Sequence, residues 1–121
     1  MTGGEPLLRK DLPQIISSIA EKPNINSVGI TTNAITLSRQ LPSLVEAGLT
    51  HANISLDTLN DSKFTEITRR KGLSTVLKAI ENACAILPKG NVKINCVVMN
   101  GFNDNELRDF VDISKDLPVD V

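Results

Sequence analysis

Residues 51–57 read HANISLD, and polar and apolar residues alternate strictly along this stretch. Successive side chains of a β-strand point to opposite faces, so Ala52, Ile54 and Leu56 would share one face. The other face would carry Asn53, Ser55 and Asp57. The stretch therefore predicts a strand with one face packed against apolar partners and one face lined by polar groups.

Two further stretches show the same division into faces. Residues 27–33, SVGITTN, place Thr31 and Asn33 opposite Ile30, and residues 91–99, NVKINCVVM, place Lys93 and Asn95 opposite Ile94. A lysine in the middle of a strand is expected either at an exposed edge or bound to an anion, since unpaired lysines are rarely buried. Asn33 and Asp57 can equally be turn or cap residues that follow their strands.

Helical patterns separate the predicted strands. Apolar residues recur three or four positions apart over residues 12–20, over 35–48 up to Gly48, over 61–87 with a break near Gly72, and over 103–117. Asp11 is expected to cap the first of these helices, and Leu107, Phe110 and Val111 to form the packed face of the last. Parallel strands need helical crossovers, so the alternation predicts an α/β fold in which residues 1–121 form one unit without a linker.

The polar strand faces distinguish between two kinds of α/β fold. An open sheet covered by helices on both sides, as in a flavodoxin-type fold, usually needs two apolar faces. A barrel with a ligand-filled interior accepts one polar face, so we expect a partial (β/α) TIM-type barrel of about four units, whereas a complete one needs roughly 200 residues or more. The residues expected to face its cavity are Thr31, Asn33, Asn53, Ser55, Asp57, Lys93 and Asn95.

Composition narrows the range of partners. The chain is 40% apolar and carries a net charge of -1, without a block of one sign. This balance argues against nucleic acid or a membrane as the main partner and favours small ligands. Cys84 and Cys96 form no C-x-x-C pair and no metal-ligand set, so we interpret them as packing thiols. The sequence shows no secretory signal and no apolar run of transmembrane length.

The opening residues, TGGEPLLRKDL, resemble the Gly-Gly-Glu-Pro motif of the radical S-adenosylmethionine (SAM) enzymes. In that superfamily the motif follows the second strand of a partial barrel and holds the amino group of SAM. The residues suit this role, because glycines let the backbone approach a ligand and the Glu5 carboxylate can accept hydrogen bonds from an ammonium group. The resemblance implies SAM binding by Gly3, Gly4 and Glu5.

Further stretches extend the resemblance over essentially the whole chain. GITTNAI, AGLTHANISLDTL, RRKG and VKINCVVMNGFNDNEL are similar, in order and spacing, to the molybdenum cofactor biosynthesis protein A family, GTP 3',8-cyclase. The resemblance implies that a 4Fe-4S cluster reduces SAM to a 5'-deoxyadenosyl radical, which takes the 3' hydrogen of GTP so that C3' attacks C8. A second 4Fe-4S cluster holds the guanine in that family, and the product enters molybdopterin synthesis. Matched positions imply that Gly4 and Ser55 contact SAM and that Thr31 and Lys93 contact GTP.

Other features of the family pattern are absent. The chain contains neither the C-x-x-x-C-x-x-C of the first cluster nor the C-terminal cysteines of the second, so we assign no metal ligand and no catalytic residue. We therefore expect that Met1 interrupts a longer protein, that residues 1–121 are the central part of a radical SAM core truncated at both ends, and that this polypeptide alone is inactive. The alternative is a non-catalytic truncated module that binds a nucleotide or a partner chain.

The remaining expectations concern single residues and the setting of the protein. His51 is interpreted as structural, and Arg69, Arg70 and Lys71 as a solvated helix end in preference to a phosphate contact. The residues RRKG and NCVVM resemble the sequences of the animal branch of the family. The resemblance implies the mitochondrial matrix for an animal protein and the cytoplasm for a bacterial one, with a homodimer as a candidate assembly of the full-length form.

Overall fold

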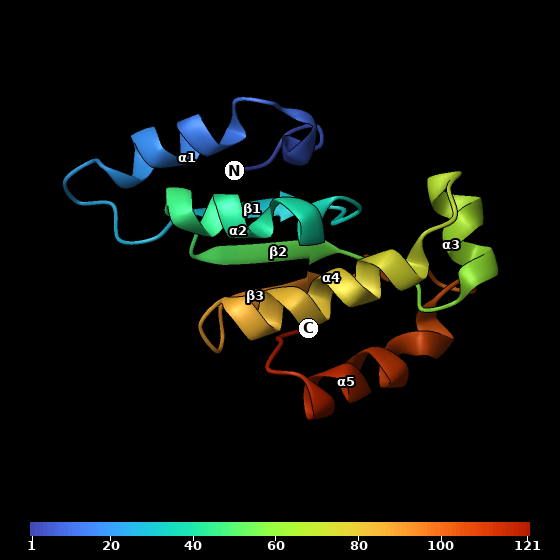
Figure 1. Cartoon of the computed structure of the whole chain (residues 1–121). Coiled ribbons are helices and arrows are strands. Elements are labelled where there is room, and N and C mark those ends of the chain that lie inside the picture. Colours follow the sequence, from blue (N-terminus) through green and yellow to red (C-terminus); the bar gives the residue numbers. More distant parts are fainter.

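Three parallel strands form the centre of the fold. The computed structural model describes residues 1–121, and its sheet has the order β1 (Gly29–Thr32), β2 (His51–Ser55) and β3 (Val92–Asn95). Both strand pairs are parallel. The helical crossovers between consecutive strands impose this direction, and the predicted α/β fold is confirmed (Figure 1).

The helices lie where the apolar spacing placed them. They are α1 (Leu12–Ala20), α2 (Leu37–Ala47), α3 (Asp61–Thr68), α4 (Leu73–Ile86) and α5 (Leu107–Asp116), with short 3-10 turns η1 (Pro6–Leu8) and η2 (Asp104–Glu106). Helix α1 packs against α2 and α2 against α4, and Figure 1 shows α2 and α4 in front of the strands. No helix combines the length and the apolar character needed to cross a membrane.

The helix-facing side of the sheet is the core. Ile30, Ala52 and Val92 are neighbours in register, as are Thr32, Ile54 and Ile94, and all six are at most 2% exposed. The intervening residues of each strand are half-buried or exposed. The division into an apolar and a polar face that the sequence predicts is therefore confirmed.

The terminal residues extend both edges of the sheet. The Met1 amino group donates to the Gly29 carbonyl over 2.6 Å, and Thr31 N donates to the Met1 carbonyl over 2.8 Å. At the other edge Asp120 forms a parallel bridge with Lys93, in which Ile94 N donates to the Asp120 carbonyl over 2.7 Å. The outer edges of β1 and β3 are thus also hydrogen-bonded, to Met1 and to Asp120.

Two local expectations were right only in part. Helix α5 buries Phe110, whereas Leu107 and Val111 are 44% and 54% exposed. The packed stripe runs instead through Phe110, Ile113 and Leu117, which have the same helical spacing and contact the core. Asp11 occupies the N-cap position of α1, but its carboxylate pairs with Arg9 over 2.8 Å and makes no capping hydrogen bond.

Gly48 gives the first testable prediction. It ends α2 in a left-handed conformation with φ +118°, and a Cβ there would lie 2.7 Å from the Ala20 Cβ. Gly48→Ala is expected to lower the free energy of unfolding by about 2 to 3 kcal/mol, because backbone strain and a clash add. Urea unfolding followed by circular dichroism measures this loss.

The matched control is Gly90→Ala. Gly90 also has a positive φ, +89°, but its added Cβ would meet no atom within 4 Å. Strain alone should then cost about 1 kcal/mol. Equal losses for the two variants would contradict a clash between α1 and the end of α2.

Candidate functional site

The uncovered face of the sheet carries a row of polar side chains. Thr31 on β1 is paired in register with Asn53 on β2, and Asn53 with Lys93 on β3. Ser55 and Asn95 form a second pair one step closer to the carboxyl ends of the strands. Paired residues of neighbouring strands present their side chains on the same face, so these five residues share one surface.

Lys93 is exposed on this surface and makes no ion pair within the chain. It does not lie at a bare edge, because Asn53 flanks it on one side and Asp120 on the other. Asp120 therefore extends the polar row by one residue that sequence reasoning missed. The sequence feature that could have indicated it is the alternation of apolar and polar residues in PVDV, residues 118–121.

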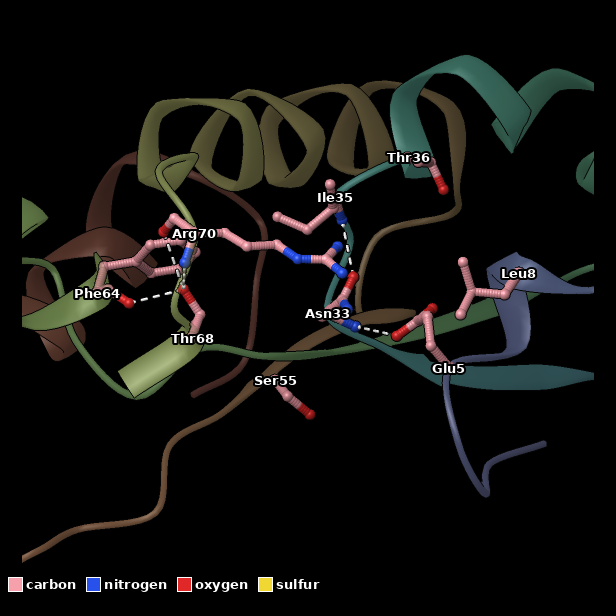
Figure 2. A pocket seen from close by; sticks show the side chains of 9 residues that line it. All are labelled: Glu5, Leu8, Asn33, Ile35, Thr36, Ser55, Phe64, Thr68 and Arg70. Atoms are coloured by element: carbon pink, nitrogen blue, oxygen red, sulfur yellow. Dashed lines mark hydrogen bonds between the residues drawn. The ribbon is translucent and has the colours of Figure 1, made fainter. Parts of the chain in front are cut away.

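A cavity of about 410 Å³ lies at the carboxyl ends of β1 and β2. Its walls come from the turn around η1, the loop after β1, the last residue of β2, and α3 with Arg70, which follows that helix (Figure 2). The lining residues are Glu5, Leu8, Asn33, Ile35, Thr36, Ser55, Phe64, Thr68 and Arg70. Ser55 belongs both to this cavity and to the polar face of the sheet.

The Gly3-Gly4-Glu5 turn borders this cavity. Gly3 and Gly4 have φ of +93° and +61°, and a Cβ on either would meet no atom within 4 Å, so a ligand can approach this backbone closely. The Glu5 carboxylate accepts hydrogen bonds from Leu7 N over 3.2 Å, from Asn33 N over 2.8 Å, and from the Thr32 hydroxyl. A carboxylate offers about four acceptor sites, so these bonds leave roughly one for a ligand.

The seven residues expected to face one cavity are divided by the structure. Asn33 and Ser55 line the cavity, whereas Thr31, Asn53, Lys93 and Asn95 lie on the open face of the sheet. Asn33 is also a turn residue, since its Oδ1 accepts from Ile35 N over 3.0 Å. Asp57 accepts from Val97 N over 2.9 Å and joins the loops after β2 and β3.

Arg70 is exposed just after the end of α3, as the sequence interpretation expected, and it also lines the cavity together with Phe64 and Thr68 of α3. Figure 2 shows its side chain extending from the α3 side toward Asn33. Thr68 fixes the turn, since its hydroxyl accepts from Arg70 N over 3.2 Å. The Arg70 side chain forms no ion pair within the chain.

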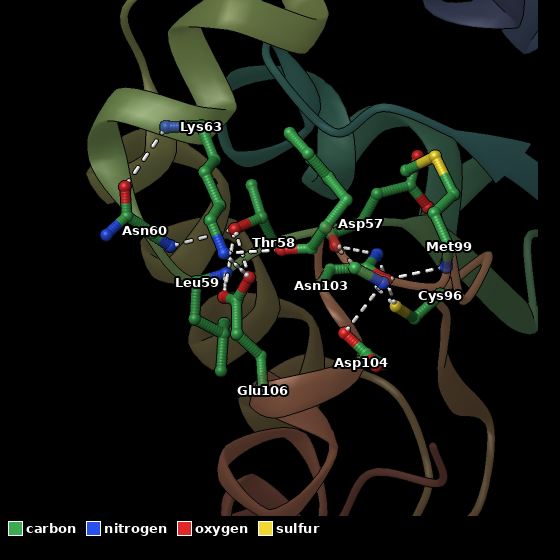
Figure 3. A network of polar contacts seen from close by, with 12 residues as sticks. Asp57, Thr58, Leu59, Asn60, Lys63, Cys96, Met99, Asn103, Asp104 and Glu106 are labelled. Carbon is green, nitrogen blue, oxygen red and sulfur yellow. Dashed lines mark hydrogen bonds and ion pairs between the residues drawn. The ribbon is translucent and has the colours of Figure 1, made fainter.

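Buried polar residues hold the loops that follow β2 and β3 in place (Figure 3). Asn103 is fully buried, donates to the carbonyls of Asp57 and Val97 over 2.7 and 2.9 Å, and accepts from Met99 N over 2.7 Å. Its three bonds fix the loops that follow β2 and β3. Glu106, only 6% exposed, accepts from Thr58 on the first of these loops.

The two cysteines lie apart from the site. The Cys84 thiol faces the Pro118 carbonyl, and the Cys96 thiol faces the Asp57 carbonyl. Burial raises the pKa of both thiols, and at Cys96 the charges of Asp57 and Glu106 raise it further. No group of three His, Cys, Asp or Glu side chains in the chain could hold a metal ion, so its residues do not fit an iron-sulfur cluster. His51 contacts its neighbour Thr50.

Comparisons with known proteins cover nearly the whole chain. The family model described as Radical SAM superfamily matches residues 1–113. All 121 residues align at 50% identity with "Molybdenum cofactor biosynthesis protein moc-5" of Caenorhabditis elegans, and at 47% with "GTP 3',8-cyclase, mitochondrial" of Arabidopsis thaliana. The identity is 46% with "GTP 3',8-cyclase" of Alkaliphilus oremlandii. The chain spans 20%, 31% and 38% of the lengths of these three relatives.

Proposed function

The chain belongs to the radical SAM superfamily, and from this premise we propose that it forms the central part of the ligand-binding core of a GTP 3',8-cyclase. The observation that carries the proposal is the position of Ser55. This residue lines the cavity at the carboxyl ends of the strands and also borders the polar row of the sheet. Two adjoining ligand sites can therefore meet at Ser55, as a reaction between a cofactor and a substrate requires.

The cavity fits the amino-acid part of SAM. The open backbone of Gly3 and Gly4 admits close approach, and the remaining acceptor site of Glu5 suits an ammonium group. Arg70 can donate two parallel hydrogen bonds to a carboxylate, and the Ser55 hydroxyl can donate or accept. Bound there, SAM would supply the radical chemistry of the superfamily, and Glu5, Ser55 and Arg70 would hold its amino-acid part.

The polar row fits GTP. The compact ammonium charge of Lys93 can meet several phosphate oxygens, and the Thr31 hydroxyl can donate to one. Asn53 and Asn95 lie beside them in register and offer both donors and acceptors to the nucleoside. We assign the phosphates to Lys93 because it is the cation of this row and makes no ion pair within the chain.

The same features support a partial barrel. The three strands are parallel, the helices cover one face, and the other face is polar and open. Such a face becomes the inner wall when a sheet curves into a (β/α) barrel. We propose that the paired backbone of Met1 and Asp120 marks the neighbouring strand positions of that barrel.

Binding of SAM tests the proposed cavity. Arg70→Gln, in the protein with its natural termini, is expected to raise the Kd for SAM about tenfold, because a charged hydrogen bond to the carboxylate is lost. Isothermal titration calorimetry measures the change.

Arg69→Gln is the matched control, since Arg69 precedes Arg70 directly but does not line the cavity. It should leave the Kd unchanged. Equal effects of the two variants, or no binding of SAM by the unaltered protein, would contradict the proposed site.

A further inference from the structure

A closed ring of polar contacts joins α3 to the turn that precedes α5 (Figure 3). Glu106 accepts from the Thr58 hydroxyl over 2.8 and 2.9 Å, and Thr58 Oγ1 in turn accepts from Asn60 N over 3.1 Å. Asn60 caps α3 by accepting from Lys63 N over 3.0 Å. The Lys63 ammonium then returns to Glu106 over 3.4 Å.

The charges in this ring are held by several partners. Glu106 also accepts from Leu59 N over 2.7 Å. Burial alone would raise the pKa of the Glu106 carboxyl, but the hydrogen bonds from Leu59, Thr58 and Lys63 together hold it below its usual range. The Lys63 ammonium donates to the Phe102 carbonyl over 2.5 Å and lies 5.4 Å from the centre of the Phe102 ring. Both ends of the Lys63–Glu106 pair are thus fixed.

Helix α3 has few other attachments. Phe64 is its single buried residue, and Asp61, Ser62, Glu66, Ile67 and Thr68 are exposed. Phe64 lies near the middle of the helix, so it leaves the helix free to tilt unless one end is also held. Lys63 and the Asn60 cap provide that second attachment at the first turn.

We propose that Lys63 and Glu106 form a latch that positions α3 and, through it, sets Arg70 in the cavity for the carboxylate of SAM; this inference rests on the proposed SAM site. Eight helical residues span about 12 Å, so a tilt of about 10° at the latch would displace the Arg70 end by about 2 Å. Such a displacement separates a guanidinium from its carboxylate partner, because hydrogen bonds fail beyond about 3.5 Å. Lys63 is therefore a positioning residue, since it does not line the cavity itself.

The test is a double-mutant cycle on SAM affinity, in the protein with its natural termini. Lys63→Met is expected to raise the Kd about tenfold in the unaltered background, and by less than about twofold in the Arg70→Gln background. A merely structural role would give about the same increase in both backgrounds. Equal increases would therefore overturn the latch, and no effect in the unaltered background would overturn it as well.

Amide hydrogen exchange provides a readout that needs no ligand. Lys63→Met should speed exchange across residues 61–70 about tenfold while leaving α4 unchanged. Unchanged exchange across α3 would overturn the latch whether or not SAM binds. Failure of the unaltered protein to bind SAM would instead overturn the proposed function, so the two failures are distinguishable.

Two further variants complete the experiment. Lys78→Met is the matched control, because Lys78 lies on α4 and pairs with Glu81 over 3.3 Å on the exposed surface. It should change neither the Kd nor the exchange of α3. Lys63→Gln, which keeps a donor but no charge, replaces Lys63→Met should the latter not fold, with the same expected outcomes.

Discussion

Replacing Lys93 by Met is expected to weaken GTP binding about 100-fold, because a lysine ammonium that meets several phosphate oxygens contributes roughly 3 kcal/mol. Lys93 lies between Asn53 and Asp120 in the polar row and makes no ion pair that would compete with a nucleotide. Methionine keeps an unbranched side chain of similar size and removes the charge and the hydrogen-bond donors of the ammonium group. Equilibrium dialysis with GTP, in the protein with its natural termini, measures the loss.

Two comparisons make this result specific to Lys93. Lys89→Met removes the same charge four residues earlier, from the exposed turn between α4 and β3, and should change GTP binding little. Raising the salt concentration should weaken binding by the unaltered protein more than by Lys93→Met, since salt screens the lost interaction. Equal losses for the Lys89 and Lys93 variants would contradict a phosphate contact at Lys93.

The polar face could be predicted because strand geometry is local. Side chains alternate with a period of two, so HANISLD alone assigns Asn53 and Ser55 to one face. The register between strands is not local. Lys93 lies beside Asn53 rather than two residues away because of hydrogen bonds between β2 and β3 that no short stretch of sequence specifies. The sequence thus predicted the members of the row on the three strands but not Asp120, and the structure supplied their order.

The cavity wall and the latch could not be predicted for the same reason. Thr58 and Glu106 are 48 residues apart in the chain, and each alone is an ordinary loop or helix residue. Arg70 follows a short helix, and its place in the cavity depends on a tertiary arrangement that no short stretch of sequence specifies. On α5, two apolar stripes had similar spacing, and only packing chose Phe110, Ile113 and Leu117 over Leu107 and Val111.

The 121-residue polypeptide by itself is expected to release no 5'-deoxyadenosine from SAM. Reductive cleavage needs an iron-sulfur cluster, and clusters are held by several cysteine thiolates. The chain offers only Cys84 and Cys96, whose pKa values are raised by burial and which face different backbone carbonyls. Anaerobic reconstitution with iron and sulfide, followed by reduction and chromatography, should give product only at the level of the protein-free sample.

The Cys84→Ser, Cys96→Ser double variant makes this prediction decisive. If the polypeptide forms no competent cluster, the variant and the unaltered chain should give the same protein-free level. Product that rises with protein concentration and disappears in the double variant would show that these two thiols hold a cluster after all. We expect the polypeptide to bind GTP with the stated dependence on Lys93 and yet to release no 5'-deoxyadenosine. This result would show that GTP binding and the reductive cleavage of SAM depend on different residues. Binding would then reside in the sheet described here, and Cys84 and Cys96 would not supply the electron.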